Sequence, residues 1–465
     1  MLGTTHRADE IWKTGRERIE HSGVRYLELT FADIAGVIKS VSMSVDHVAE
    51  AHAGGVPYQS QQTGEHAMML VPDLDTFTIL PSGAAPPHTA RVLCDIRWPS
   101  DAGGVGPRAL LGRVLDEADQ MGFVPQMAAE ADYYVLDTDA AGQPMIDRDP
   151  SSYRVGADLA NRIERARIDT LSALESMGIA VSITRHGGRA GQHEIRLGYE
   201  QLLTTADHTV TIRSIVKTLA RRNSLHATFM PKPFAGQHGS GWRLRQRMLN
   251  KADGRDAWAD RDHPYGLSEI GLCYLAGQME HAAGMAAILG PSVNSYKRLA
   301  PEDDTPLSVA WGLLSKRPYA RVPDAREGTP AQIALYAADS TAHPYLALAI
   351  ACRCGLSGIS LRSRITPPSD ASPTNSTRGA RSGASRSRLQ PRLPLSLGQA
   401  IEALDADGFI RSSLGAPLYA RYQESRLAEW AEYQAQVTDW EVQHDMGHYQ
   451  RLHDPNHSTR HPHRA

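Results

Sequence analysis

A run of three arginines at alternate positions constrains the fold of this chain more than any other feature. Arg243, Arg245 and Arg247 follow a Gly-Ser-Gly tripeptide at residues 239–241. Because the side chains of a β-strand alternate between its two faces, a strand here points all three guanidinium groups to one side. Such a strand is either an exposed basic strand at the edge of a sheet or part of the wall of an anion-binding site. The glycines, which allow a close approach between backbone and ligand, favour the anion.

Length and composition exclude several classes of protein. With 465 residues, 41% of them hydrophobic, the chain can bury a large core. A formal net charge of -3 argues against a nucleic-acid partner. Four scattered cysteines are typical of reduced thiols, and no apolar run of membrane-spanning length is visible. We therefore expect a cytoplasmic protein without membrane contact.

The order of expected elements indicates an α+β fold with two units. Alternating residues predict strands at 24–31 and 37–43, joined by a turn at 33–36, and further strands at 76–80 and 90–96. A glycine-rich segment at 103–107 marks a boundary. Helical periodicity at 109–121 and a strand at 128–136 then begin a larger unit. The expected domains are 1–103 and 104–465.

Two segments are expected to lie outside the packed core. Residues 362–392 are rich in Ser, Pro, Thr, Arg and Gly and have few large apolar groups to bury, which predicts a flexible insertion. Helical periodicity returns at 397–404 and 422–440. The polar, histidine-rich tail at 453–465 is expected to be disordered.

Several short motifs occur in a fixed order along the chain. They are F-A-D-I-A-G at 31–36, P-D-L-D-T-F at 72–77, A-G-Q-H-E at 190–194, A-T-F-M-P-K-P at 227–233, N-S-Y-K-R-L at 294–299 and D-S-T-A-H-P-Y-L at 339–346. In this order they resemble the glutamine synthetase family over nearly the whole chain. The resemblance implies a small N-terminal β-grasp-like domain and a large catalytic domain, in which helices flank a curved antiparallel sheet.

The resemblance also implies a chemistry. Family members use ATP to convert a carboxylate into an acyl phosphate, which ammonia or an amine then attacks. Cations must neutralise the phosphoryl oxygens, and active relatives use two divalent metals, Mg or Mn. The expected partners are a small-molecule acid, an amine and other copies of the chain, arranged in a ring of ten or twelve subunits.

When the family's metal ligands are mapped onto this sequence, the ligands of one metal site are retained. Glu130 and Asp132 stand two residues apart on one expected strand, so both carboxylates point to the same face. Glu194 keeps its place in A-G-Q-x-E, while the family glutamate eight residues earlier is His186 here. The resemblance therefore implies one metal, rather than two, with Asp132, His186 and Glu194 as its ligands.

The second metal site is altered. Its histidine is Arg243 and its last glutamate is Ala334, which leaves Glu130 alone. A guanidinium group is always charged and cannot ligate a cation. We infer that Arg243 takes the place of the second metal, pairs with Glu130 and clamps an anionic oxygen.

The substrate positions are carried over in the same way. Arg298 matches the arginine that grips the substrate carboxylate, and its usual partner is Tyr336 here. Asp304 falls where the family has a flap glutamate that accepts a proton from the amine. The remaining assignments are Gly239 for substrate, Arg245, Lys316 and Arg321 for nucleotide phosphates, and Arg243, Asp304 and Arg321 for catalysis.

Two classes of function stay open. The first is a divergent ATP-dependent ligase that joins glutamate or an analogue to an amine other than ammonia, since the family's ammonium motif has no match near residues 55–60. The second is a catalytically inactive scaffold or binding protein. A third reading is an ATP-independent enzyme for an anionic substrate. The regular spacing of the arginines favours the ligase, because a decaying site would lose charge at random.

Overall fold

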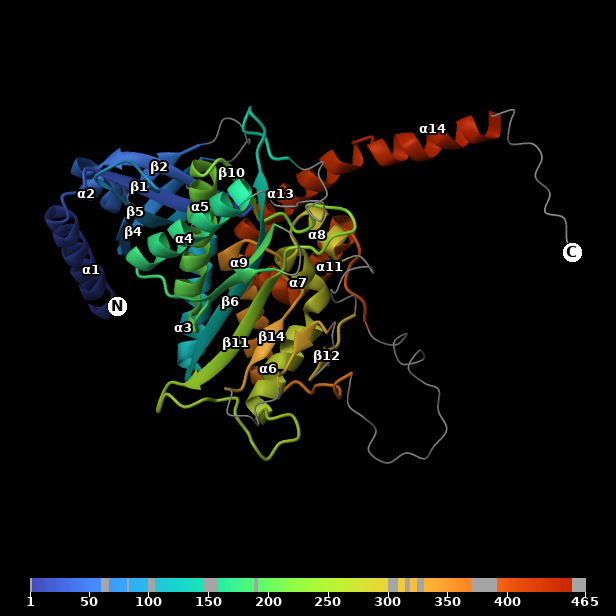
Figure 1. The fold of residues 1–465 in the computed structure, drawn as a ribbon. Helices are drawn as coiled ribbons and strands as arrows, with labels where there is room; N and C mark the ends of the chain where they lie inside the picture. Colours follow the sequence, from blue (N-terminus) through green and yellow to red (C-terminus); the bar gives the residue numbers. More distant parts are fainter. Residues whose placement is uncertain are drawn as a thin grey trace, which may run out of the picture.

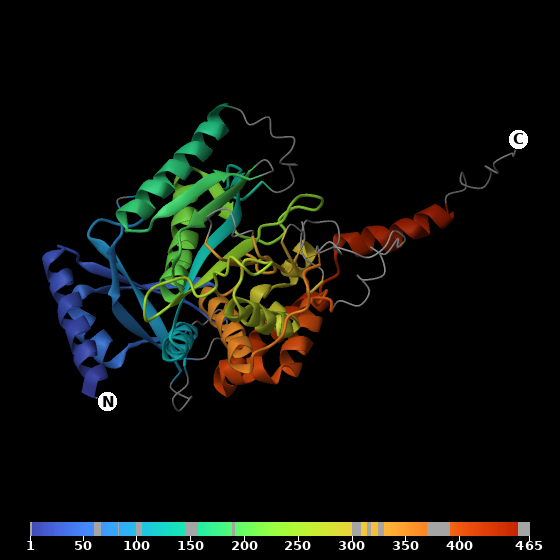
Figure 2. The same cartoon turned by 90° about the horizontal axis from the view of Figure 1, so that it is seen from below.

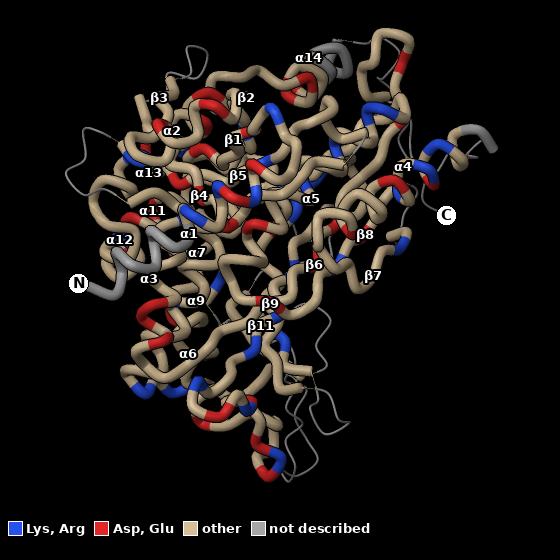
Figure 3. Tube along the Cα trace, turned by 90° about the vertical axis from the view of Figure 1, so that its left-hand side faces the viewer, with Lys and Arg blue, Asp and Glu red and all other residues tan. Residues whose placement is uncertain are grey.

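Two β-sheets and their covering helices make up the protein in the computed structural model (Figure 1). The structure describes residues 2–59, 67–81, 83–98, 105–145, 157–187, 191–299, 308–313, 318–323, 330–369 and 391–453. The α+β class and the two-sheet plan agree with the prediction. Most of the expected insertion, residues 370–390, and the tail at 454–465 lie outside the described residues. Acidic and basic residues are interspersed over the elements in the view of Figure 3.

The small sheet lies near the N-terminus and has the strand order β2-β1-β5-β4-β3. Its β1–β2 hairpin forms at the predicted turn, where Asp33 Oδ1 accepts hydrogen bonds from the backbone N–H groups of Ala35 and Val37. Gly36 adopts a φ of 85°, in the region that favours glycine. The strands are β1 Tyr26–Ala32, β2 Ile38–Ser44, β3 Val56–Tyr58, β4 Met68–Ile79 and β5 Thr89–Arg97.

The large sheet is built around one long strand, β6, which pairs with both β11 and β8 in antiparallel fashion. The strand order is β12-β13-β14-β11-β6-β8-β7, and β9 and β10 also pair with β6. Its strands are β6 Phe123–Asp137, β7 Val181–His186, β8 Gln192–Leu197, β9 Glu200–Gln201, β10 Leu225–Thr228, β11 Trp242–Asn250, β12 Trp311–Gly312, β13 Ala320–Arg321 and β14 Ile333–Leu335.

Helix α9 is the core helix of the large unit and packs against α3, α5 and α6. Among the described residues it is the one helix long and apolar enough to cross a membrane, but 72% of that stretch is buried in the protein. It approaches α6 closely because both helices carry glycine at the crossing: a Cβ on Gly358 would lie 2.1 Å from the carbonyl oxygen of Cys273.

The other helices surround this core, and α14 extends away from the body of the molecule (Figures 1 and 2). The helices are α1 Leu2–His21, α2 Val48–Gly54, α3 Pro107–Gln120, α4 Ala157–Ser176, α5 Leu202–Arg222, α6 Glu269–Glu280, α7 Ala282–Leu289, α8 Val293–Arg298, α9 Pro344–Leu361, α11 Leu397–Ala406, α12 Gly408–Leu414, α13 Ala416–Gln434 and α14 Asp439–His453, with a 3₁₀ turn at Val45–His47.

A buried ion network ties the small sheet to the large unit. Arg108 of α3 forms ion pairs with Asp73 of β4 at 2.8 Å and Asp207 of α5 at 2.9 Å. Asp207 also accepts a hydrogen bond from the hydroxyl of Tyr345 in α9, at 2.7 Å. The network thus connects β4 of the small sheet with α3, α5 and α9 of the large unit.

Candidate functional site

Strand register places the three predicted carboxylates on one face of the large sheet. Glu130 of β6 stands opposite Arg243 of β11 on one side and Arg196 of β8 on the other. Asp132 stands opposite Glu194. Residues opposite one another in an antiparallel ladder share a face, so all five side chains meet.

The guanidinium group of Arg243 lies among the carboxylates. Its Nη1 donates to Glu130 and, over 3.2 Å, to Glu194, while its Nη2 donates to Asp132 over 3.3 Å. The three carboxylate side chains are at most 9% exposed, whereas that of Arg243 is 29% exposed. The acids therefore form the floor of the site, and the guanidinium covers them.

Three more arginines complete the arrangement. Arg185 pairs with Glu194 at 2.7 Å, and Arg196 and Arg245 pair with Glu130 at 2.6 and 3.1 Å. Four guanidinium groups thus balance three carboxylates, which leaves an excess of one positive charge when all are ionised. We refer to these residues as the arginine–carboxylate cluster: Arg185, Arg196, Arg243, Arg245, Glu130, Asp132 and Glu194.

The two carboxylates of β6 differ in acidity. Burial raises the pKa of Asp132 to about 6, although the nearby Arg243 opposes this shift. Burial acts on Glu130 in the same direction, but Arg243, Arg245 and Arg196 outweigh it and hold the pKa of Glu130 below its usual value. Glu130 therefore stays ionised at neutral pH. Asp132, in contrast, takes up a proton at a pH only slightly below neutral.

His186 does not join the carboxylates, contrary to the prediction. In the ladder between β7 and β8, Arg185 stands opposite Glu194 and His186 stands opposite His193. The rings of His186 and His193 are 4.8 Å apart. Since neighbours along a strand point to opposite faces, His186 lies on the far face of the sheet and Arg185 takes the position beside Glu194.

The residues present do not fit a divalent cation at the cluster. In the described part of the chain, no group of three or more His, Cys, Asp or Glu side chains is arranged to hold a metal ion. All three carboxylates accept hydrogen bonds from Arg243, and a guanidinium cannot be a metal ligand. Of the expected set, Asp132 and Glu194 are brought together and His186 is not.

Further predicted residues extend the cluster across the sheet. Ala334 of β14 stands opposite both Arg245 and Arg321, so Arg321 faces the same side. Arg321 donates through Nε to the carbonyl oxygen of Leu313 over 3.2 Å. Tyr336 follows two residues after Ala334 and is half-buried. The predicted residues Asp304 and Lys316 lie outside the described residues.

Arg298 and Gly239 are packed against each other at the end of β11. A Cβ on Gly239 would lie 2.5 Å from Arg298 Cγ and from the carbonyl oxygen of Pro231, so a side chain here would force a rearrangement. The Arg298 side chain is buried and donates to the carbonyl oxygens of Ala337 and Ala338. The predicted substrate arginine lies near Asp132, because a Cβ on Gly241 would lie 3.6 Å from both Arg298 Nη1 and Asp132 Oδ2.

Sequence reasoning missed Arg185 and Arg196. Arg196 stands two residues after Glu194, so the period of a strand was signal enough to place both on one face. Arg185 carried no such signal, because its position beside Glu194 depends on the register between β7 and β8.

Comparisons with known proteins agree with the fold and the motifs. The family model described as glutamine synthetase, catalytic domain, matches residues 104–444. A glutamine synthetase of Thermotoga maritima is 33% identical over 440 residues, covering 93% of this chain and 98% of the relative. One from Halobacterium salinarum is 34% identical over 439 residues, covering 91% and 94%. Among solved structures, apo GmaS has a TM-score of 0.78 at 26% identity and covers 93% of this chain and 99% of its own, and a GmaS complex with ADP has a TM-score of 0.77 at 26% identity with the same coverage.

Proposed function

This chain belongs to the glutamine synthetase family of ATP-dependent, amide-forming ligases, and we propose that it joins a carboxylic acid to an amine other than ammonia. Glutamate or a close analogue is the proposed acid. One observation carries the proposal: Arg243 binds all three cluster carboxylates and presents a fixed positive charge where relatives are expected to hold a divalent ion.

The proposed reaction has two steps. An oxygen of the acid attacks the γ-phosphorus of ATP and ADP departs, which leaves an acyl phosphate. The amine nitrogen then attacks the acyl carbon, phosphate leaves and the nitrogen loses a proton. Arg243 and Arg245, the partly exposed members of β11, neutralise the phosphoryl oxygens through charge-assisted hydrogen bonds. We assign the grip on the acid to Arg298 and the uptake of the amine proton to Asp304.

The assay is the release of ADP and phosphate in the presence of ATP, magnesium, one acid and one amine. We expect turnover with glutamate-like acids and primary alkylamines, and much less with ammonium. Arg243→Met should lower kcat at least a hundredfold, as the loss of an oxyanion-stabilising donor does elsewhere. Arg247→Met is the matched control, because Arg247 lies on the same strand but contacts Gln126 and Tyr199 instead. Faster turnover with ammonium than with amines would contradict the proposed nucleophile.

A second candidate is an anion-binding protein that does not turn over ATP. Guanidinium groups cover the carboxylates, so the exposed side of the cluster is positively charged, which favours anion binding. The two candidates separate in one experiment: saturable binding of a small anion without ADP release from any mixture, and without nucleotide binding by calorimetry, supports the second and excludes the first.

Membership of the family supports a proposal for assembly and location. Its enzymes form oligomeric rings, and we propose a ring of ten or twelve copies of this chain in the cytoplasm. In such rings the small N-terminal domain completes the site of the neighbouring subunit. Light scattering coupled to size-exclusion chromatography measures the assembled mass, and a monomer would contradict the ring.

A further inference from the structure

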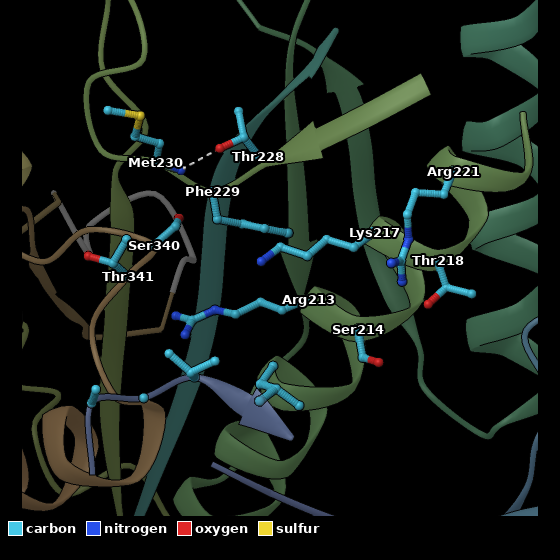
Figure 4. Close-up of a pocket in the computed structure, with 14 residues that line it drawn as sticks. Arg213, Ser214, Lys217, Thr218, Arg221, Thr228, Phe229, Met230, Ser340 and Thr341 are labelled. Atoms are coloured by element: carbon cyan, nitrogen blue, oxygen red, sulfur yellow. Dashed lines mark hydrogen bonds between the residues drawn. The ribbon is translucent and has the colours of Figure 1, made fainter. Parts of the chain in front are cut away.

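A second site lies at a cavity of about 350 Å³ between α5 and the turn that joins β1 to β2 (Figure 4). Its walls come from the turn at 35–38, from one face of α5 and from the segments 228–230 and 340–341. No member of the arginine–carboxylate cluster is among the residues that line it, and none of the described lining residues is acidic. Its three charged lining residues, Arg213, Lys217 and Arg221, are all basic.

Arg213 has hydrogen-bonding capacity that the protein does not use. The residue is only 6% exposed, and its Nη1 donates to the carbonyl oxygen of Ala342 over 2.9 Å. Its Nε and Nη2 have no hydrogen-bond partner. The guanidinium lies over the ring of Trp242, 5.4 Å from its centroid, and burial lowers its pKa to about 10. Asp339 lies close enough to oppose this shift, but it accepts no hydrogen bond from Nε or Nη2. Since buried donors without acceptors are costly, these two groups are suited to an anionic oxygen of a ligand.

Lys217 and Arg221 continue the same face of α5 at successive turns. Like charges four residues apart on a helix repel one another. Both residues are exposed, and within the described ranges neither forms an ion pair with a carboxylate, although Lys217 lies 5.9 Å from the ring centroid of Phe229. In Figure 4, Arg213 and Lys217 extend from α5 toward Phe229 and Ser340. The helix thus presents three positive charges to a cavity whose described lining has no acidic residue, with the buried Asp339 as the nearby carboxylate.

We propose that this cavity binds a small dianion bearing phosphate or carboxylate groups. Its volume lies at the lower end of the range for small-molecule sites, which suits a compact metabolite. The lining hydroxyl groups of Ser214, Thr218 and Thr228 supply further donors around the three cations, whereas the hydroxyl of Thr341 already donates to Asp339. Because the walls belong to the hairpin turn of the small sheet and to α5, a bound anion ties these two parts together.

The cavity is also in direct contact with β6 and with the residue pair before Arg243, which position the cluster. Ser340 lines the cavity, and its hydroxyl is within hydrogen-bonding distance of the carbonyl oxygens of Asp132 and Gly241, at 3.0 and 3.2 Å. Trp242, on which Arg213 stacks, is the residue before Arg243. The cavity is therefore linked by these contacts to the backbone segments that position the cluster.

The test is calorimetric titration of the full-length protein at constant ionic strength. Inorganic phosphate and glutarate, both dianions at pH 8, serve as separate probes, so that the phosphate and carboxylate classes are distinguished. We expect one of them to bind saturably, and Lys217→Met and Arg221→Met each to weaken that binding about tenfold, the equivalent of about 1.4 kcal/mol. Both side chains are exposed, so the variants should fold.

Two controls identify the site. Arg222→Met removes a charge from the same helix at an exposed position that does not line the cavity, and should leave the affinity unchanged. Arg245→Met weakens anion binding at the cluster and should leave the α5 site intact. The proposal is overturned if neither probe saturates, or if Arg222→Met weakens binding as much as Lys217→Met does. Neither result depends on whether the protein is an amide-forming ligase.

Discussion

Replacing Arg243 with methionine tests the central feature of the site. The substitution keeps an unbranched side chain and removes the charge that all three cluster carboxylates share. Removing one partner of a buried ion pair costs about 3–5 kcal/mol. Glu130 keeps its pairs with Arg196 and Arg245, and Glu194 keeps Arg185, so the cost falls mainly on Asp132. We therefore expect a loss at the lower end of that range, about 3 kcal/mol at pH 8.

Divalent cations should then distinguish the variant from the parent. Without the guanidinium, Asp132 loses its pair with Arg243 and lies beside Glu130 and Glu194, whose oxygens are the ligand type that a hard cation prefers. Millimolar Mg²⁺ or Mn²⁺ should stabilise Arg243→Met, by about 2.7 kcal/mol when the ion is at a hundred times its Kd, and should leave the parent unchanged. Urea denaturation followed by tryptophan fluorescence, at fixed protein concentration, measures both effects.

Arg247→Met again serves as the control. It removes an arginine from the same face of β11 without touching a cluster carboxylate, and we expect a loss of less than about 1 kcal/mol and no response to cations. The reasoning is refuted if Arg243→Met is as stable as the parent, or if the parent gains as much stability from Mn²⁺ as the variant does.

Three further predictions concern single positions. The pKa of Asp132 is raised to about 6 from an unfolded value near 4, so its ionisation favours the unfolded chain as pH rises through this window. Asp132→Asn should therefore stabilise the protein more at pH 7.5 than at pH 4.5. A stability gain in urea denaturation that does not depend on pH would contradict this. Gly358→Val should lower the melting temperature steeply, since even a Cβ there meets backbone at 2.1 Å, and an unchanged melting temperature would show that α6 and α9 can separate freely. Asp207→Asn leaves Arg108 paired with Asp73 at 2.8 Å and Asp95 at 3.7 Å, so it should cost less than the roughly 3–5 kcal/mol of a buried pair that loses a sole partner; no loss in urea denaturation would argue against the network as the link between the two units.

Periodicity along single strands was sufficient to predict much of the site. The alternation of Arg243 and Arg245 placed both on one face, and the spacing of Glu130 and Asp132 did the same for the carboxylates. The turn at 33–36 also formed as expected, because Asp33 and Gly36 provide the side-chain acceptor and the positive φ that such a turn requires.

Contacts between strands distant in the chain were beyond the same reasoning. Carrying a family ligand onto His186 assumed a register for β7, and a shift of one residue moves a side chain to the other face of a sheet. The pairing between β7 and β8 has an irregularity between Val181 and Ile183, and the sequence pattern of β7 does not predict it. The basic cavity escaped prediction for a related reason, since the hairpin turn and α5 are separated by more than 150 residues along the chain.

The positive charge of Arg243 belongs to a side chain that is covalently attached to β11. A chelator cannot strip it from the protein, and a competing ion cannot exchange with it. Every folded copy carries it from the moment the strand pairs, whatever the ionic supply of the cell. The amino-acid sequence itself therefore fixes the size and position of this charge, with no need for an ion from solution.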